Sequence, residues 1–408
     1  MFIRLIILVS VFLFSGIALA DDINKTTELN ESTTNPERPA GVSAEPGFLR
    51  LGPVAIHPYL SLSEAHSDNV FFTTTGKESD FITSLAPGLY LELPLGADTL
   101  SFNANMIYTG YAKYSSQDTT DYSFSEKGNF ELGTSLNLKL SDTYMHSHEG
   151  AGSSATGVTE EFNNNAAIAS LTYLLADVSK VRLDYSLNSW TYEEESFRSR
   201  DEDLVSAYIY YQIMPKTSLF LEYAFKDERF YVKSNGLDNE VQSGFLGFAW
   251  EPSAKSKVII KGGYLDKSFD QSSNGSINTW TGSVDANYYF SDSTSLKLLA
   301  SRDVDESALL GTTYYIETGF TGELTQKFLE RLLGVVRGSY WDDKYSNSLA
   351  GETEARKDKT ALVGLGIRYF WLRWLESDLD YNHTNKISNI SGANYTENRE
   401  ILSLKAAF

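Results

Sequence analysis

Apolar and polar residues alternate one by one along most of this chain, from residue 54 to its end. In one segment the apolar residues Leu219 and Leu221 alternate with positions that include the charged residues Glu222 and Lys226. Further segments of this kind lie at residues 100–109, 181–188, 296–298 and 361–369. Successive side chains of a β-strand point to opposite faces, so this period of two predicts strands with one apolar and one polar face. No segment after residue 50 shows a period near 3.6, and we expect almost no helix.

The connections between these segments alternate between tight and long. Eight tight connections are predicted near residues 95–98, 133–135, 176–179, 214–216, 252–254, 291–293, 325–327 and 371–374. Nine longer polar connections lie near residues 66–79, 115–120, 146–160, 193–201, 231–237, 270–276, 304–310, 343–354 and 387–395. Short connections at one end and long ones at the other are typical of membrane-spanning barrels. We therefore predict an all-β fold, a transmembrane antiparallel up-and-down β-barrel of about 18 strands over residues 51–408, with short periplasmic turns and longer extracellular loops.

The last segment, residues 400–408, is expected to close this barrel. Leu402, Leu404 and Phe408 share one face of an extended strand, whereas Lys405 lies on the other face. A terminal strand leaves an open edge unless it pairs with another strand, so we expect it to pair with the first strand. A strand and its connection take about 20 residues together, more than the ~9–11 that a tilted strand needs to cross a bilayer. The strands should therefore extend beyond the membrane on the loop side.

Residues 1–20 have the features of a cleaved signal peptide. Arg4 precedes an apolar run over residues 5–14, and an Ala-Leu-Ala cleavage site ends at Ala20. An uncleaved anchor helix is the alternative, but the run is shorter than the ~20 residues that a spanning helix needs. Residues 21–50 are polar and lack apolar periodicity, which predicts a disordered periplasmic leader. No later segment is apolar for long enough to form a helical span.

The composition narrows the chemistry that this chain can support. It contains no cysteine, so disulfides and thiolate chemistry are excluded although the secretory route leads to an oxidising compartment. The formal net charge of -20 argues against nucleic acid as a partner, because bulk electrostatics would repel it. An acidic exterior instead suits loops that face water.

Aromatic residues make up 13% of the chain and lie beside the predicted connections. Trp371 lies at a tight connection, and Trp190, Tyr192, Phe230 and Tyr231 lie beside long ones. We interpret them as the interfacial girdles of a membrane barrel. The alternative is the core of a soluble β-sandwich, which would not keep the tight and long rhythm along the whole chain.

Charged residues also occur in the middle of predicted strands, opposite the apolar face. We predict that they line the lumen: Asp184, Glu222, Lys226, Lys261, Asp285, Lys297, Glu317, Arg368, Asp380 and Lys405. A charge at mid-membrane depth costs about 2–4 kcal/mol if it faces lipid, so these side chains should face a wet interior. A lumen with both signs would favour neutral or weakly charged solutes. The alternative is that these groups pair with one another and only hold the wall together.

The first predicted hairpin resembles that of a known family. Residues 58–71, which contain Asp68-Asn69, and residues 79–89, which contain Pro87-Gly88, resemble the opening strands of the β-barrel porin type 2 family of outer-membrane proteins. This family includes exopolysaccharide-operon outer-membrane proteins of Gram-negative bacteria. The resemblance implies a monomeric outer-membrane barrel that conducts polymer or small hydrophilic solutes, without an active site. The terminal Phe408 resembles the aromatic ending that the barrel-assembly machinery reads.

No motif of enzymatic or cofactor chemistry stands out in this chain. The sequence has no G-x-S-x-G elbow, no H-E-x-x-H and no Walker loop, so we expect neither catalytic nor cofactor-binding residues. His146, His148 and Glu149 have a spacing that could hold a metal, but isolated surface histidines are the better interpretation. Loop aspartates raise the possibility of calcium, although solvated charge explains them better: Asp68, Asp118, Asp121, Asp342 and Asp343.

Two functional hypotheses remain. The first is a pore for export or diffusion of carbohydrate or small hydrophilic solutes, with Tyr192 and Tyr231 at its mouth stacking on sugar rings. The second is a non-conducting scaffold or binding protein that acts through its extracellular loops, although these loops are short for that role. The expected partners are outer-membrane lipid and lipopolysaccharide, the barrel-assembly machinery, and polysaccharide.

Overall fold

The computed structural model describes residues 49–149, 159–271, 274–309, 311–348 and 352–408. The predicted signal peptide at residues 1–20 lies outside these ranges, as does all but the end of the predicted leader at 21–50. Within the described ranges, no helix is long and apolar enough to cross a membrane.

Antiparallel strands make up most of the described chain. They are β1 (Leu49–Leu51), β2 (Val54–Ser67), β3 (Asp80–Leu95), β4 (Asp98–Tyr111), β5 (Thr119–Glu131), β6 (Leu136–Glu149), β7 (Glu160–Ala176), β8 (Ser179–Tyr192), β9 (Arg200–Met214), β10 (Thr217–Phe230), β11 (Asn239–Ser253), β12 (Ser256–Phe269), β13 (Ser276–Ser291), β14 (Thr294–Glu306), β15 (Tyr314–Leu329), β16 (Leu332–Ser348), β17 (Ala355–Leu372), β18 (Leu375–Ser388) and β19 (Tyr395–Ala407). Short 3-10 turns, η2 (Ser115–Gln117), η3 (Ser196–Arg198) and η4 (Lys233–Asn235), lie in three of the loops.

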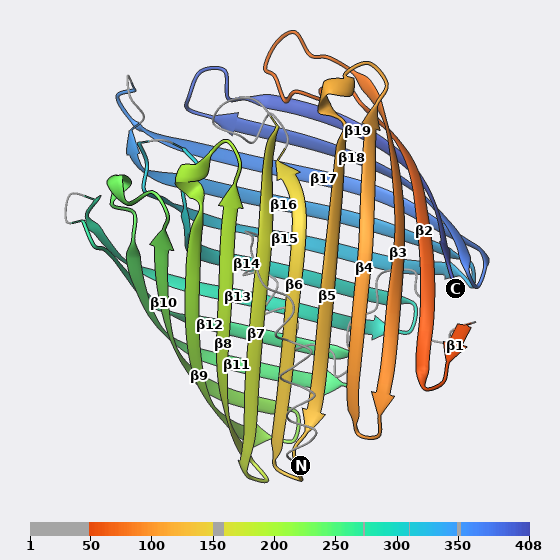
Figure 1. Ribbon diagram of the computed structural model, residues 1–408, viewed down its shortest axis with the longest axis vertical. Coiled ribbons are helices and arrows are strands. Elements are labelled where there is room, and N and C mark those ends of the chain that lie inside the picture. The colour runs from red at the N-terminus through yellow and green to blue at the C-terminus, as the bar shows by residue number, and fades with distance from the viewer. Residues whose placement is uncertain (1–48, 150–158, 272–273, 310, 349–351) are drawn as a thin grey trace.

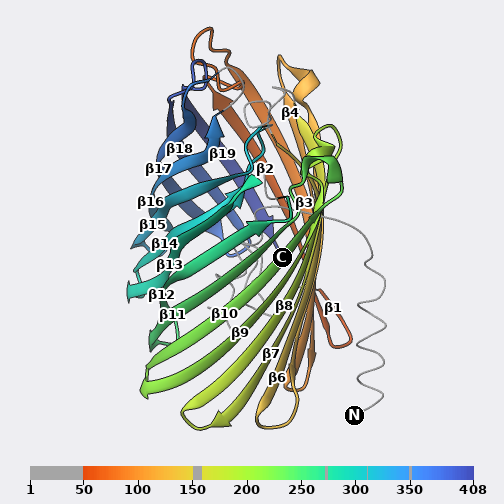
Figure 2. The same cartoon turned by 90° about the vertical axis from the view of Figure 1, so that its left-hand side faces the viewer.

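The strands β2 to β19 form a closed ring of 18. Each pairs antiparallel with the next, and β19 pairs with β2, with Leu404 opposite Leu62. The three-residue strand β1 pairs antiparallel with the start of β2, with Leu51 opposite Val54. Figures 1 and 2 show the ring as a flattened cylinder, in which the strands of one wall (β2–β8) cross those of the other (β11–β18). The predicted 18-strand barrel and its closure by the terminal strand are confirmed.

Tight turns and long loops alternate around this ring, as the sequence predicts. Residues 96–97 alone separate β3 from β4, whereas residues 68–79 separate β2 from β3. One predicted turn is wrong, because residues 325–327 continue the ladder between β15 and β16 and the turn lies at residues 330–331. The strands reach 18 residues in β17, well above the ~9–11 needed to cross a bilayer. Polar residues beside a turn therefore lie in the part of a strand that extends past the apolar, lipid-facing band of the barrel.

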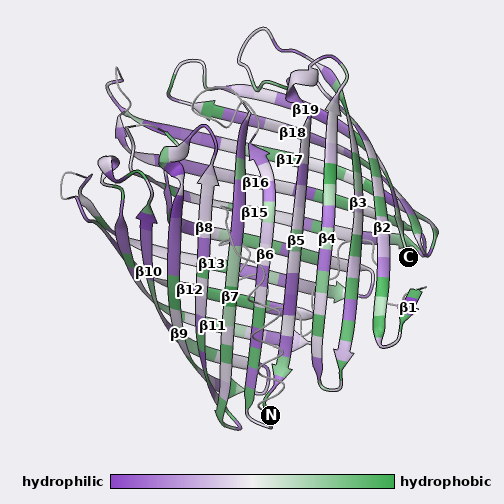
Figure 3. Cartoon of the chain, viewed as in Figure 1, coloured by the Kyte–Doolittle hydropathy of each residue, from purple (hydrophilic) through white to green (hydrophobic). Residues whose placement is uncertain are grey.

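The two faces of the wall differ in character. Outward-facing Leu221, Leu246 and Leu379 are each more than half exposed, whereas the inward-facing Glu222 is buried. Figure 3 shows hydrophobic and hydrophilic residues interleaved along the strands, as a wall between an apolar and a polar medium requires. At the turn end, Phe408 stacks on Trp374 with ring centroids 5.2 Å apart. The backbone N–H of Phe408 donates to the carbonyl oxygen of Pro58 at 3.1 Å.

One part of the outward face departs from this rule. Glu126 of β5 and Asp142 of β6 are direct cross-strand neighbours on the same face as Leu138, within the span of the apolar band. Asn165 of β7 donates its side-chain amide to Asp142 and to the carbonyl oxygen of Thr143. The first of these hydrogen bonds satisfies part of the Asp142 carboxylate, which is buried.

Candidate functional site

The candidate site is the inner face of the barrel. Cross-strand partners share a face of a sheet, and the register places all ten predicted residues opposite the outward apolar residues of their strands. These residues are Asp184, Glu222, Lys226, Lys261, Asp285, Lys297, Glu317, Arg368, Asp380 and Lys405. Their role in lining a conducting path stays a prediction, because it depends on the space between them as well as on the face they share.

Glu222 and Lys261 form a buried ion pair on this face. The Lys261 Nζ lies 3.0 Å and 3.1 Å from the two carboxylate oxygens of Glu222, across the intervening strand β11. Tyr208 donates its hydroxyl to the same carboxylate at 3.2 Å, and Lys261 lies over the ring of Phe245 at 4.2 Å. Both charged side chains are almost fully enclosed, so each depends on the other for compensation.

Other predicted residues are paired in the same way. Asp184 binds Arg182 at 2.8 Å, and Asp380 binds Arg337 at 2.6 Å. Arg337 also binds Glu323 at 2.9 Å, so one guanidinium joins three strands.

Near the turn end, Asp378 binds two of the predicted cations. Its carboxylate lies 2.5 Å from Arg368 Nε and 3.1 Å from Lys405 Nζ. Most of the predicted residues therefore form ion pairs. This pairing supports the interpretation that these groups hold the wall together, alongside a role in selectivity. Asp285 and Glu317 take part in further interactions.

Lys297 has a different environment from these pairs. It lies on the inner face opposite Asn287 and Glu323, yet its side chain is exposed and makes no ion pair within the described chain. Lys139 of β6 is also inward and exposed. An inward residue is exposed only where the interior is not filled by side chains, so the barrel has space for solvent beside these two lysines.

The loop-side ends of β14 and β15 lean into the barrel. Pairing between β13 and β14 ends at Gly282 and Arg302, whereas β14 and β15 stay paired up to Glu306. Beyond this separation, Val304 packs against Val241 of β11 and Leu265 of β12, both on the inner face. In the same region the Tyr314 ring stacks on Phe269 at 6.2 Å. We call residues 303–306 and 314–316 the inward hairpin end.

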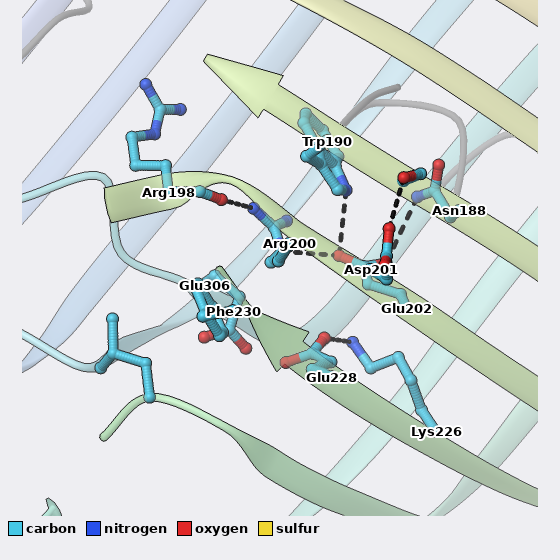
Figure 4. Close-up of polar contacts among 12 residues, drawn as sticks. Asn188, Trp190, Arg198, Arg200, Asp201, Glu202, Lys226, Glu228, Phe230 and Glu306 are labelled. Atoms are coloured by element: carbon cyan, nitrogen blue, oxygen red, sulfur yellow. Dashed lines mark hydrogen bonds and ion pairs between the residues drawn. The ribbon is translucent and has the colours of Figure 1, made fainter. Parts of the chain in front are cut away.

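A chain of buried charges ties the inward hairpin end to the wall. Lys226 pairs with Glu228 (Figure 4). Glu228 lies 3.2 Å from Lys267, and Lys267 pairs in turn with Glu306. The side chains of Glu228 and Lys267 are fully enclosed. The loop half of this wall is therefore filled by side chains rather than by open space.

A second buried cluster lies beside it, between β8 and β9. Trp190 and Tyr192 stack face to face at 5.8 Å, and Arg200 and Arg198 lie over their respective rings. Figure 4 shows Trp190, Arg200 and Glu202 of this cluster. Glu202 accepts hydrogen bonds from Arg200 Nε at 2.8 Å and from the Trp190 indole at 3.1 Å. Arg–aromatic stacking and charge-assisted hydrogen bonds together stabilise such a cluster.

This cluster corrects the predicted loop-side girdle. Trp190, Tyr192 and Phe230 are buried on the inner face. They occupy inward positions at strand ends, where their rings pack against neighbouring arginines. Tyr192 is therefore not available to stack on a sugar ring. Tyr231 is exposed but donates its hydroxyl to Asp201 at 3.0 Å on the outward side, away from the lumen.

The predicted alternatives for metal binding have other partners. His146 hydrogen-bonds to Asn163, His148 pairs with Asp121 at 2.7 Å, and Glu149 binds Arg198 at 2.8 Å. No group of three or more potential ligands forms a metal cluster within the part of the chain that the structure describes.

The loop aspartates that might hold calcium are engaged as well. Asp68 accepts from the backbone and side chain of Asn398, Asp118 accepts from the Tyr111 backbone at 2.7 Å, and Asp342 pairs with Lys344. Asp343 also takes part in an interaction. Burial raises the pKa of Asp68, but the two hydrogen bonds from Asn398 outweigh it and hold that pKa below its ordinary value.

Several inward charges lie outside the set predicted from the sequence. Lys139 lies in the alternating stretch Leu136-Asn137-Leu138-Lys139-Leu140, so the same period of two would have identified it. Lys267, in contrast, lies near a loop, and its burial depends on the inward hairpin end, which no local pattern predicts.

Comparisons with known proteins agree with this architecture. Residues 45–408 match the family model described as "Putative beta-barrel porin 2". A comparison with curated proteins gave no match.

Among solved structures, OccK2 (OpdF) of Pseudomonas aeruginosa in complex with glucuronate is 14% identical, with 90% of this chain and 99% of that chain covered and a TM-score of 0.47. OpdK of P. aeruginosa with vanillate is 11% identical, with coverage of 86% and 99% and a TM-score of 0.46. Acinetobacter baumannii OccAB4 is 12% identical, with coverage of 86% and 98% and a TM-score of 0.46.

Proposed function

Because this chain belongs to the "Putative beta-barrel porin 2" family and forms a porin-like outer-membrane barrel, we propose that it is a channel for export or diffusion of small hydrophilic solutes or carbohydrate, including exopolysaccharide. A ring of 18 strands has the size of porins that enclose an aqueous channel. The observation that carries the proposal is the open interior beside the inward, exposed Lys139 and Lys297. Solvent that reaches these residues provides a path for solutes within the turn half of the barrel.

The second candidate function is a non-conducting scaffold or binding protein that acts through its loops. The inward hairpin end and the enclosed Glu228 and Lys267 favour it, since they narrow the interior at the loop end. The two functions differ in one measurable property, which is whether ions pass through the barrel.

Conductance across a planar bilayer tests the proposal. The purified barrel is expected to give discrete current steps, and reversal of charge in Lys297→Glu is expected to change their size or ion selectivity. Lys359→Glu, at an outward position near the loops, serves as the matched control and should leave the current unchanged. Absence of steps from correctly folded protein would favour the scaffold.

Liposome swelling tests the substrate class of the proposed channel. Neutral mono- and oligosaccharides should enter vesicles that contain the barrel at rates that fall with sugar size. Swelling with salts but not with any sugar would contradict the carbohydrate part of the proposal.

The proposal includes a route to the membrane. Secretion would use the signal peptide at residues 1–20, with cleavage near Ala20, and the assembly machinery would read the terminal strand that ends at Phe408. The outward apolar residues would contact outer-membrane lipid and lipopolysaccharide. Support for this route comes from the alternation of faces and from the position of β19 as the closing strand.

A further inference from the structure

The inner face near the turns carries more positive than negative side chains, although the whole chain has a net charge of -20. We consider the six residues of each strand nearest its tight turn and keep those whose register places them inward. The cations are Lys127, Lys139, Lys180, Arg182, Lys257, Lys261, Lys297, Lys327, Arg337, Arg368 and Lys405. The carboxylates are Glu92, Glu131, Asp184, Glu222, Glu251, Glu376, Asp378 and Asp380. Asp285 and Glu323 are also inward and lie one residue farther from their turns, which leaves eleven cations against ten carboxylates when they are included.

The carboxylates of this region are largely committed to pairs. Glu222, Asp184 and Asp380 each bind a lysine or arginine at 3.0 Å or less. Asp378 and Glu376 both approach Lys405, and Glu251 lies 3.5 Å from Lys257. Glu131 accepts a hydrogen bond from the Asn137 amide at 3.0 Å.

Five lysines of the same region have no carboxylate partner within the described residues. One of them, Lys327, lies near the end of β15, and we call the other four, Lys127, Lys139, Lys180 and Lys297, the turn-side lysines. Lys139 and Lys297 are exposed to the interior. Lys127 is partly exposed and faces Ser101 and Ser141, with Glu92 beyond Ser101 as the nearest carboxylate along the register.

The turn-side lysines lie among charges of both signs. Lys139 of β6 experiences the positive charges of Lys180 and Lys257 and the negative charges of Asp184 and Glu131. Lys180 lies over the ring of Tyr210 at 4.5 Å, so an aromatic face rather than a carboxylate holds it. Lysines that share a region repel one another, and an anion bound among them would reduce this repulsion.

We infer that the channel prefers anionic solutes, and that the turn-side lysines attract carboxylate- or sulfate-bearing molecules into the periplasmic half of the lumen. This inference rests on the proposed function. It differs from the expectation of a charge-balanced lumen, because most of the carboxylates near the turns are paired with cations whereas Lys139 and Lys297 are exposed and unpaired within the described residues. It also opposes the preference for cations that the acidic composition of the whole chain would suggest.

The reversal potential in a potassium chloride gradient tests this preference. The wild-type barrel is expected to pass chloride in preference to potassium, and Lys127→Gln/Lys139→Gln/Lys297→Gln to lose that preference. One unit charge at roughly 10 Å in water changes local ion concentration about twofold, so the loss of three charges should lower the chloride-to-potassium permeability ratio by at least about eightfold at low salt. Lys359→Gln, a matched change on the outward face, should leave the ratio unchanged. Conducting wild-type protein that prefers potassium would overturn the inference.

Binding of a trianionic dye, pyrene trisulfonate, supplies a readout that needs no conduction. Wild-type barrel in neutral detergent is expected to bind the dye saturably and to release it as salt is raised, whereas the triple variant should bind at least about fivefold more weakly. Dye binding without any current would support the anion-binding site but contradict the proposed channel. Failure of folded wild-type protein to bind the dye would overturn the inference, whether or not it conducts.

Discussion

At the scale of single residues, some of the charges that hold the inner wall have partners two strands away. Glu222 of β10 reaches Lys261 of β12 across β11, and Arg337 of β16 reaches Asp380 of β18 across β17. The period of two in the sequence predicts which face each charge occupies. It does not predict the partner, because a one-residue change of register would bring a different side chain into reach.

The Glu222–Lys261 pair should show strong coupling. Lys261→Met leaves the Glu222 carboxylate enclosed without its cation and should lower the free energy of unfolding by about 3–5 kcal/mol. Glu222→Leu/Lys261→Met removes both charges and should recover most of that loss. Urea-induced unfolding in lipid vesicles, followed by tryptophan fluorescence, measures both variants. Equal destabilisation by the single and double variants would show that the pair is not coupled.

At the scale of the elements, most of the fold follows from the sequence. The alternation predicts the strands, the tight and long connections predict the order of turns and loops, and the last segment was correctly expected to pair with the first strand. The turn predicted at residues 325–327 is misplaced, because polar residues at a strand end resemble a turn. The inward hairpin end could not be predicted, since it depends on contacts of Val304 with strands far away in the sequence.

The inward hairpin end should restrict ion flow at the loop end. Val304→Ser/Glu306→Gln weakens its contact with the Val241–Leu265 cluster and with Lys267, so the single-channel conductance should rise or fluctuate more. Planar-bilayer recordings measure this effect. Glu240→Gln, at an outward exposed position of β11, is the control. Unchanged conductance in the double variant would place the narrowest part of the path elsewhere.

At the scale of the whole molecule, the barrel separates an apolar exterior from a charged interior. Leu324 and Thr321 illustrate the difference, because both belong to β15 but lie on opposite faces. Leu324 is exposed outward, and Thr321 is exposed to the interior. Hydropathy averaged over a window does not reveal such a wall, whereas the alternation does.

An arginine should therefore destabilise the barrel at the first of these positions, Leu324, and have little effect at the second, Thr321. Leu324→Arg places a charge against lipid and should cost about 2–4 kcal/mol of folding free energy if it lies near the bilayer midplane. Thr321→Arg faces water and should cost little. The fraction that resists unfolding by sodium dodecyl sulfate without heating, seen as a gel shift, measures both. Comparable losses in the two variants would contradict the assignment of faces.

The pairing of β2 with β19 also bears on how the molecule is made. Neither strand has both of its neighbours until synthesis is complete, so the ring joins the most distant parts of the chain at its final step. Such high contact order makes assembly slow and gives a truncated product no route to closure. Conversely, the two ends lie side by side at one seam, and a circular permutant opened at a different tight turn would contain the same neighbours around the ring. The order of synthesis, and not the architecture of the closed barrel, therefore determines where the seam lies.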